Sequence, residues 1–458
     1  MSDPSTVAVA SSAGKATGLP VRLQCKFYLQ HKRRHCGMTR KAGLDYCSEH
    51  LNTLRQQDPN LAAVKGRRIA CPIDPRHSVW EKDVTRHLRR CNTAKKNRPP
   101  VDCPWVKLDY NWKPLPASET HEPHHAADDA SILRSIPILK RCYAQNFAAS
   151  PISLEVKRNA TVESHRFPQL LGSKKHALQQ SSLIQYLLDN KMAPQSDSDD
   201  ITYIEFGCGR AEFSRYLNRS VFDYRGIAAT ANGAHRVPRQ PRFLLVDRAS
   251  NRMKFDSKFR EDLDELYGDS VPADQRTYAT LDRKKIDIKD LYIDQLLQDS
   301  DPRCVAISKH LCGVATDLTI HCCLNSDVLH TQKKKLHGMV IAMCCRHVCD
   351  AHQYVNRPFI ESLIEGSEMS YVEFFNSLKK IASWAVCGRR EGINDRDINH
   401  HFTNLPVIER EELGQRARRI IDEGRAEFLR SNGYKVSLVK YIESSVSLEN
   451  VAMVVTRI

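Results

Sequence analysis

The sequence predicts an α/β domain, built on a mostly parallel sheet, that follows two small metal-binding modules. Strand-like apolar segments alternate with helical segments from about residue 160 onwards, which is typical of a parallel sheet with helices on both faces. The first hundred residues instead concentrate cysteine, histidine, lysine and arginine and hold few long apolar segments. Such a composition buries too little apolar surface to fold by hydrophobicity alone, so metal binding is expected there.

Changes in composition divide the chain into five parts. Residues 1–21 are rich in Ser, Ala and Gly and lack the features of a signal peptide, so we expect a disordered lead-in. Two modules follow at 22–52 and 69–96. A mixed connecting region is expected over 97–159 and the α/β domain over 160–458.

Periodicity places the main elements of that domain. Helices are expected at 176–190, at 210–218 and at 410–434, the last with a glycine stop at Gly433. Apolar runs with polar ends predict strands at 201–209, 241–248, 303–310, 336–345, 435–442 and 450–458.

Charge and cysteine usage narrow the partners and the compartment. The 458 residues carry a formal net charge of +15, which favours polyanions such as nucleic acid. The 16 cysteines occur without a secretory signal, so a reducing cytoplasmic or nuclear setting, not secretion, is expected. No run of about 18 apolar residues is present, so no membrane span is expected.

The first module contains four candidate metal ligands, in the pattern C-x10-C-x10-C-x2-H: Cys25, Cys36, Cys47 and His50. Four soft or borderline donors suit a tetrahedral structural zinc ion. The neighbouring His31 and His35 leave the ligand set open.

The second module contains Cys71, His77, His87 and Cys91, in the pattern C-x5-H-x9-H-x3-C. On a helix the last two residues lie four positions apart on one face and are able to hold one metal together. This module closely resembles the CHHC zinc fingers of minor-spliceosome and tRNA-methyltransferase type. Both clusters supply four ligands and leave no open catalytic position, so two structural zinc ions are expected.

A nucleotide-type site is predicted where the first strand of the domain ends, in "YIEFGCGRAEF". Glu205, Gly207 and Gly209 lie at the turn into a helix, where glycine lets the backbone approach a ligand closely. A dinucleotide fingerprint requires a third glycine, but Glu212 stands there and its carboxylate disfavours a pyrophosphate. S-adenosylmethionine has no phosphate, and an acidic strand end suits its cationic methionine portion.

Two further carboxylates fit the same ligand. Asp247 ends the next apolar strand and is a candidate for the ribose hydroxyls. It follows Gly209 by 38 residues, more than the usual ~20, which an insertion around 228–240 would explain. Asp287 is a candidate for the adenine amino group.

The order of features resembles one family closely. The closing helix, strand, short loop and strand is how class I methyltransferases finish, with the last strand antiparallel. With both zinc modules, "KKHALQQSSLI", "EFGCGRAEFS", "SKHLCGVATDL", "AMCCRHVC" and "IIDEGRAEFLRSNGY", the chain resembles, over about residues 22–458, the tRNA 2′-O-methyltransferases that modify nucleotide 4 of the acceptor stem. The resemblance implies an S-adenosylmethionine donor, a ribose acceptor, and glycine, proline and histidine tRNAs. Arg346 departs from the histidine that the family usually has.

Lys309 and His310 leave a buried-looking strand at its carboxyl end, where ligands bind in open α/β sheets. We expect one of them to act as general base or hydroxyl-orienting group for the ribose. Asp317 either orients one of the two or caps the following helix.

Cys344, Cys345, His347 and Cys349 follow the next strand. A third metal site there is disfavoured, because adjacent cysteines do not easily share one ion, and packing beside the cofactor is expected instead.

Two other functions stay open at this point. One is a zinc-finger RNA-binding protein with an inactive methyltransferase fold, and the other is a protein or small-molecule methyltransferase. The intact glycine loop and Asp247 speak against the first, and the basic zinc modules speak against the second.

Overall fold

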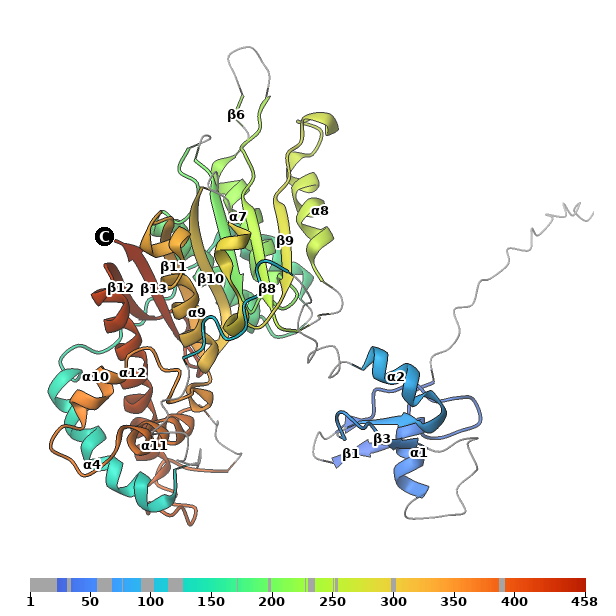
Figure 1. Ribbon diagram of the computed structural model, residues 1–458. Coiled ribbons are helices and arrows are strands. Elements are labelled where there is room, and N and C mark those ends of the chain that lie inside the picture. The colour runs from blue at the N-terminus through green and yellow to red at the C-terminus, as the bar shows by residue number, and fades with distance from the viewer. Residues whose placement is uncertain are drawn as a thin grey trace, which may run out of the picture. The chain divides into compact units, whose positions relative to one another are not determined.

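A computed structural model describes residues 23–30, 34–55, 68–75, 77–91, 103–113, 127–170, 172–196, 199–226, 228–229, 235–249, 251, 254–297, 302–386 and 392–458. The chain divides into two compact units, Met1–Pro99 and Pro100–Ile458 (Figure 1). The expected lead-in at 1–21 lies outside the described residues.

The first unit is built from very short elements around its cysteines. Two hairpins pair β1 (Tyr28–Leu29) with β2 (Arg34–His35) and β3 (Arg68–Ala70) with β4 (Ser78–Trp80), and the helices are α1 (Ser48–Arg55) and α2 (Val84–Arg90). Its two small buried clusters are centred on the cysteines of the two modules, as expected of a region that metal ions stabilise.

The second unit contains a seven-stranded sheet in the order β12-β13-β11-β10-β5-β8-β9. The strands are β5 (Ile201–Phe206), β8 (Arg242–Asp247), β9 (Thr280–Lys285), β10 (Arg303–Cys312), β11 (Leu336–Cys344), β12 (Tyr434–Lys440) and β13 (Val451–Arg457). Neighbours pair in parallel from β11 to β9, whereas β13 is antiparallel to both β11 and β12. The predicted α/β class, the mostly parallel sheet and the antiparallel last strand are confirmed.

One strand of the sheet, β9, was not predicted from the sequence. The β9 segment "TLDRKK" lies at the edge of the sheet and has no fully buried residue. Because an edge strand needs little apolar surface, its charged sequence carried no strand signal.

Helices pack on both faces of the sheet, and a further helical layer adjoins it. The helices are α4 (Asp129–Asn146), α5 (Ala160–Arg166), α6 (Lys175–Asp189), α7 (Glu212–Arg225), α8 (Asp256–Tyr267), α9 (Val314–Leu324), α10 (Arg357–Leu363), α11 (Tyr371–Trp384) and α12 (Val407–Ser431). The three predicted helices correspond to α6, α7 and α12. Among the helices in the described ranges, none is long and apolar enough to cross a membrane.

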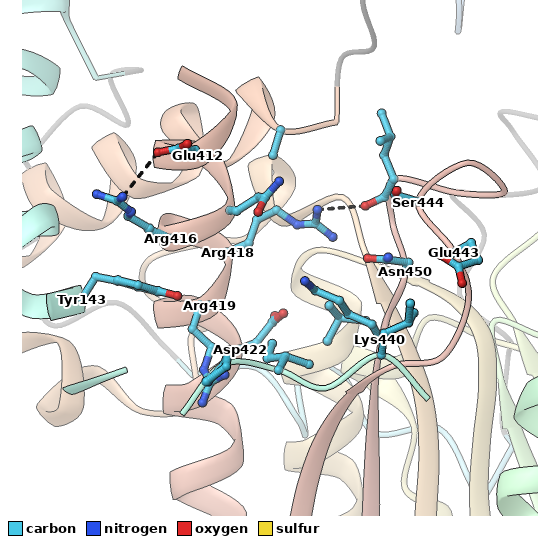
Figure 2. A pocket seen from close by; sticks show the side chains of 17 residues that line it. Tyr143, Glu412, Arg416, Arg418, Arg419, Asp422, Lys440, Glu443, Ser444 and Asn450 are labelled. Atoms are coloured by element: carbon cyan, nitrogen blue, oxygen red, sulfur yellow. Dashed lines mark hydrogen bonds and ion pairs between the residues drawn. The ribbon is translucent and has the colours of Figure 1, made fainter. Parts of the chain in front are cut away.

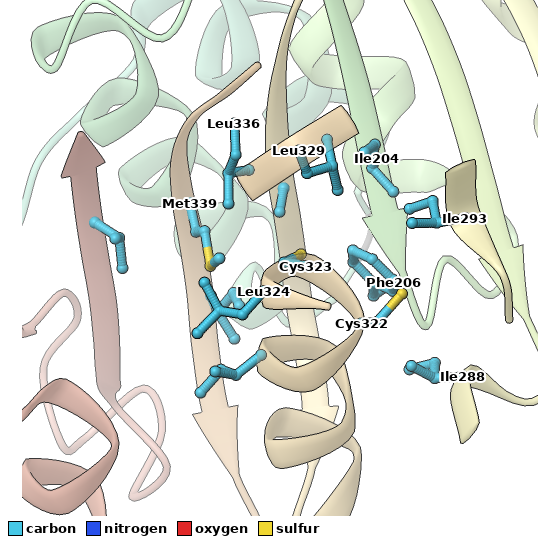
Figure 3. Close-up of a cluster of buried hydrophobic side chains, with 14 of the residues drawn as sticks. Ile204, Phe206, Ile288, Ile293, Cys322, Cys323, Leu324, Leu329, Leu336 and Met339 are labelled. Atoms are coloured by element: carbon cyan, nitrogen blue, oxygen red, sulfur yellow. The ribbon is translucent and has the colours of Figure 1, made fainter. Parts of the chain in front are cut away.

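Alternate residues of the strands build two cores, because successive side chains of a strand point to opposite faces. Ile204 and Phe206 of β5 join the cluster beneath α9 (Figure 3). Ile201 and Tyr203 join the opposite cluster, which contains residues of α6 and α7. These two clusters hold the sheet on both faces. The residues at the ends of the strands are therefore positioned by the sheet.

The expected connecting region, 97–159, contributes in its described parts to the second unit. The Asn111 side chain donates hydrogen bonds of 2.7 and 2.8 Å to the backbone oxygens of Ile288 and Leu291. Helix α4 shares a buried cluster with α10, α11 and α12. This helical layer was not predicted from the sequence.

Gly313 lets the loop after β11 approach the end of β10. Its φ is +52°, and an added Cβ would lie 2.5 Å from the backbone oxygen of Val348. The N–H of Gly313 also donates to the backbone oxygen of Cys344 over 3.1 Å. These two strand ends are therefore held together at a point that has no room for a side chain.

We predict that Gly313→Ala lowers the free energy of unfolding by about 3 kcal/mol, since overpacking of ~1–3 kcal/mol adds to backbone strain of ~1–2 kcal/mol. The matched control is Gly366→Ala, where φ is +75° and an added Cβ meets no described atom within 4 Å. Strain alone should cost this control about 1–2 kcal/mol. Urea unfolding followed by circular dichroism measures both, and equal losses would contradict the close approach.

Candidate active site and zinc modules

The first module brings Cys25, Cys36, Cys47 and His50 together, with all four donor atoms within 4.8 Å of one another. The Nδ1 atom of His50 lies 3.5 and 3.4 Å from the sulfurs of Cys25 and Cys47, and the ring of Phe27 stacks on it. His35 instead places its Nδ1 3.1 Å from the Lys26 carbonyl. The ligand set left open by the sequence therefore contains His50 and not His35, while His31 lies outside the described residues.

The second module brings together its four predicted ligands, Cys71, His77, His87 and Cys91. The two sulfurs are 3.9 Å apart, and the two Nε2 atoms are 3.1 Å apart. Tetrahedral zinc holds two sulfur ligands about 3.8 Å apart, as its ~2.3 Å bonds require. Both modules fit zinc in the number, type and spacing of their donors.

The glycine loop turns the chain from β5 into α7 with three residues in the left-handed region. The φ angles of Gly207, Gly209 and Ala211 are +68°, +51° and +63°. An added Cβ on Gly209 would meet no atom within 4 Å among the described residues. This open space above the loop fits a ligand that approaches the backbone closely.

Two carboxylates lie against this loop. Asp247, at the end of β8, accepts a hydrogen bond of 2.7 Å from the Gly209 N–H, so the long spacing in sequence is closed in space. Glu205 is buried beneath the loop and accepts from the Ser214 hydroxyl. Burial raises the pKa of the Glu205 carboxyl to about 7.

Asp287 stands at the same edge of the sheet. The preceding residue, Ile286, donates its N–H to the backbone oxygen of Asp247 over 3.0 Å. The Asp287 carboxylate accepts from the N–H of Lys289 at the start of a single 3₁₀ turn. The structure thus brings the predicted cofactor carboxylates to the ends of neighbouring strands.

An irregularity in β10 interrupts its pairing with β11 at Lys309 and His310. The pairing with β11 shifts between Ser308 and Leu311, where β10 has one more residue than its partner. A bulge of this kind redirects side chains at the end of a strand. An added Cβ on Gly207 would lie 3.6 Å from the backbone oxygen of His310, so this strand end adjoins the glycine loop.

Lys309 is held by residues of the helices that precede the sheet. Its Nζ atom lies 2.7 Å from Nδ1 of His176 in α6. Glu212, nearby in α7, pairs with Arg166 over 2.7 Å. Burial lowers the pKa of the Lys309 ammonium group to about 8, although the Glu212 carboxylate opposes this shift.

His310 faces a group of thiols. Its Nε2 atom is 3.4 Å from the Cys312 sulfur and 3.8 Å from the Cys344 sulfur. The hydrogen bonds of Cys344 and His310 lower the pKa of the Cys312 thiol to about 4. Lys309 and His310 therefore have different surroundings, although they are neighbours in the chain.

Comparisons with known families agree with this arrangement. Residues 178–456 match the family described as "Methyltransferase TRM13". Residues 23–51 match the "CCCH zinc finger in TRM13 protein", and residues 68–92 match the "U11-48K-like CHHC zinc finger". The chain belongs to the TRM13 methyltransferase family.

Relatives in this family match the chain over nearly its whole length. The "tRNA:m(4)X modification enzyme TRM13" of Eremothecium gossypii is 42% identical, with 96% of each chain covered. The protein of that name from Saccharomyces cerevisiae is 38% identical over 95% of this chain and 96% of its own. The "tRNA:m(4)X modification enzyme TRM13 homolog" of Mus musculus is 24% identical over 97% and 96%.

Asp317 does not contact Lys309 or His310 through the hydrogen bonds and ion pairs of its carboxylate. It is fully buried, and both of its carboxylate oxygens accept from Arg425 of α12, over 3.0 and 2.6 Å. A carboxylate closed off by a two-pronged guanidinium contact is no longer available to orient Lys309 or His310. We therefore assign Asp317 to the packing of α9 on α12.

Arg346, the departure from the usual histidine, is buried behind the end of β11. It pairs with Asp422 and Glu449 over 2.5 and 2.6 Å and donates to the backbone oxygen of Met343 over 2.8 Å. Glu449 also accepts from the N–H of Cys345 over 2.9 Å. In this chain the arginine fixes the backbone that carries the two adjacent cysteines.

Three residues near Lys309 were not predicted from the sequence. His176 contacts Lys309 itself, and Arg166 and Gln180 contact the neighbouring Glu212. His176 and Gln180 lie in the quoted "KKHALQQSSLI", which predicted only a helix and contributed to the family resemblance. Arg166 lies in α5, before this segment. No sequence pattern connects it with Glu212. Each reaches Lys309 or Glu212 only after the helices pack.

A cavity of about 460 Å³ lies between α12 and the ends of β12 and β13 (Figure 2). Arg416, Arg419 and Lys440 bring positive charge to it, and Glu412 pairs with Arg416 over 3.4 Å. Its Lys440 and Val451 pair with each other at the edge where β11 ends. Glu412, Asp422 and Glu443 also line the cavity, which therefore contains charges of both signs.

We predict that Asp317→Asn lowers the free energy of unfolding by about 3 kcal/mol, because the buried Arg425 loses its bidentate carboxylate partner and keeps only the longer, 3.6 Å contact with Asp422. The matched control is Glu361→Gln, which breaks the half-exposed pair with Arg357 and should cost at most about 0.5 kcal/mol. Thermal and urea unfolding measure both variants. Losses of similar size would contradict the role assigned to the buried pair.

Proposed function

We propose that this protein transfers a methyl group from S-adenosylmethionine to the ribose 2′-hydroxyl of nucleotide 4 in the acceptor stem of tRNA. The observation that carries this proposal is the meeting of the glycine loop and the Lys309 strand end at one edge of the sheet. Ligands of open α/β sheets bind at this edge. As the resemblance implies, we propose glycine, proline and histidine tRNAs as substrates.

The residues of the loop are suited to S-adenosylmethionine, whose sulfonium group supplies an electrophilic methyl. Asp247 would hold the ribose hydroxyls, and Asp287 would accept from the adenine amino group. Gly207 and Gly209 leave the backbone open to the ligand. Glu205 would act from beneath the loop, where the cationic methionine portion would favour the charged form of its buried carboxyl group.

The charge of the chain, its zinc modules and the names of its relatives support tRNA as the methyl acceptor. A net charge of +15 favours a polyanion, and the relatives are named as tRNA modification enzymes. The shallow minor groove of A-form RNA displays the 2′-hydroxyls. A ribose in the acceptor stem is therefore within reach without flipping of a base.

Lys309 is the residue that we place against the ribose. Its side chain leaves the sheet next to the glycine loop and is positioned by His176. From this place its nitrogen would orient the 2′-hydroxyl and take up the proton as the oxygen attacks the methyl group. His310, whose Nε2 faces the thiols, is the second candidate for this role.

To test this proposal, the full-length protein is incubated with labelled S-adenosylmethionine and total tRNA. The labelled nucleotide is then mapped. Label on the 2′-oxygen of nucleotide 4 supports the proposal, and label confined to a base refutes ribose chemistry. Label in protein and none in tRNA favours a protein methyltransferase. Binding of tRNA without binding of S-adenosylmethionine favours an RNA-binding protein with an inactive fold. Among the described residues no cysteine forms a disulfide, and we propose a cytoplasmic or nuclear location, where thiols stay reduced.

We predict that Lys309→Ala lowers the rate of methyl transfer at least 100-fold, the lower range for loss of a general base. Binding of tRNA should persist, because one charge among many contributes little to it. Single-turnover methylation and filter binding measure the two quantities.

The control is Lys157→Ala, which removes a positive charge that pairs with Asp189. Lys157 is far from the glycine loop in the sequence, and its ion pair involves no residue of that loop. It should retain methyl transfer near the wild-type rate. Turnover of Lys309→Ala comparable to this control would sink the assignment of Lys309.

A further inference from the structure

A third group of soft ligands lies at the carboxyl ends of β10 and β11. His310, Cys312, Cys344 and Cys345 place one nitrogen and three sulfurs within 4.8 Å of one another. We infer that these four side chains bind a third zinc ion, in addition to the two ions of the N-terminal modules. The inference concerns the metal content of the second unit and does not depend on the reaction proposed above.

The spacing of the donors matches that of the two zinc fingers in the same chain. In the third group the Cys312 sulfur is 3.2 Å from the Cys344 sulfur and 3.4 Å from Nε2 of His310, which is 3.8 Å from the Cys344 sulfur. The donor separations given above for the fingers lie between 3.1 and 3.9 Å. Tetrahedral zinc holds a sulfur and a nitrogen ligand about 3.6 Å apart and two sulfurs about 3.8 Å apart, so the Cys312 and Cys344 sulfurs would move about 0.6 Å apart as the ion binds.

Strand geometry explains how two pairs of neighbours converge. His310 and Cys312 are two positions apart and so share one face of β10. Cys312 lies directly opposite Cys344 in the parallel register. The absence of a side chain at Gly313 lets the chain after β11 close over this point.

The backbone of Cys345 removes the geometric objection that adjacent cysteines do not easily share one ion. Its φ and ψ are +50° and +49°, a left-handed conformation that is rare for cysteine. This turn reverses the chain and brings the Cys345 sulfur back beside the Cys344 sulfur, within the 4.8 Å group. The N–H of Cys345 is fixed by Glu449, which Arg346 and Arg418 hold.

The donor set indicates the kind of metal site. Three thiols and one imidazole form a Cys₃His set, which closes the coordination sphere of a structural zinc ion. Each thiol would release its proton to solvent as the ion binds. Cys344 is buried, Cys312 and Cys345 are partly buried, and His310 is exposed. The ion would therefore clamp the two strand ends beside Lys309 and would occupy His310 as a ligand.

The test is the zinc content of the full-length protein, measured by mass spectrometry after dialysis against metal-free buffer. We expect three zinc ions per chain in the wild type and two in Cys344→Ala and in Cys345→Ala. The matched control is Cys304→Ala, which removes a fully buried thiol from the other end of β10 and should retain three.

Wild-type protein decides the question even if the variants fail to fold. Zinc should protect Cys312, Cys344 and Cys345 from iodoacetamide, and replacement by Co²⁺ should add one thiolate-to-cobalt absorption band set to those of the fingers. Two zinc ions per chain with these three thiols freely alkylated would overturn the inference. So would two ions together with a disulfide between Cys312 and Cys344, detected by peptide mapping without reductant.

Neither outcome decides whether the protein methylates tRNA, because metal counting and alkylation require no methyl transfer. A third ion would remove only His310 as a candidate for contact with the ribose, since His310 would be a ligand. A chain with three zinc ions that leaves tRNA unmodified would refute the proposed function alone. A chain with two zinc ions that methylates tRNA would refute the third site alone.

Discussion

The buried ion pair between Arg425 and Asp317 is the contact on which the site depends most. Both residues are completely inaccessible to solvent, and the Arg425 guanidinium also donates to the Gly313 carbonyl and to the Cys349 sulfur. A charge in this position is costly unless its partner is present and well oriented. The pair therefore fixes α12 against the segment after β10 and the segment after β11 together.

The same helix extends this constraint to the edge where the chemistry is proposed. Asp422, one turn before Arg425, holds Arg346, and Arg346 holds Glu449 beside the Cys345 N–H. Arg346 pairs with two carboxylates and Asp422 with two guanidinium groups, so the loss of one member weakens several buried contacts and the network acts as a unit. The strand ends that carry Lys309 and the thiols are thus positioned by α12, which approaches from a different layer of the unit.

Local signals were sufficient to predict much of the fold. The apolar runs of β5, β8, β10 and β11 and the helical spacing of α6 and α12 reflect burial within each segment, and such burial is visible in one stretch of sequence. The edge strand β9 and the layer of α4 and α11 were missed, because the first is polar and the second depends on partners far away in the chain. Tertiary packing decides such elements, and no local pattern records it.

The site residues likewise differ in whether the sequence predicts their contacts. Ligands close in sequence, as in the zinc fingers and the glycine loop, were predicted because spacing alone implies their geometry. The partner of Asp317 and the meeting of Cys312 with Cys344 follow from helix docking and from strand register, which a single sequence does not specify. The adjacency of Cys344 and Cys345 even argued against a shared ion, since an ordinary strand would send their side chains to opposite faces. The left-handed turn at Cys345 removes that objection, and Glu449 together with Arg346 supplies the contacts that stabilise it.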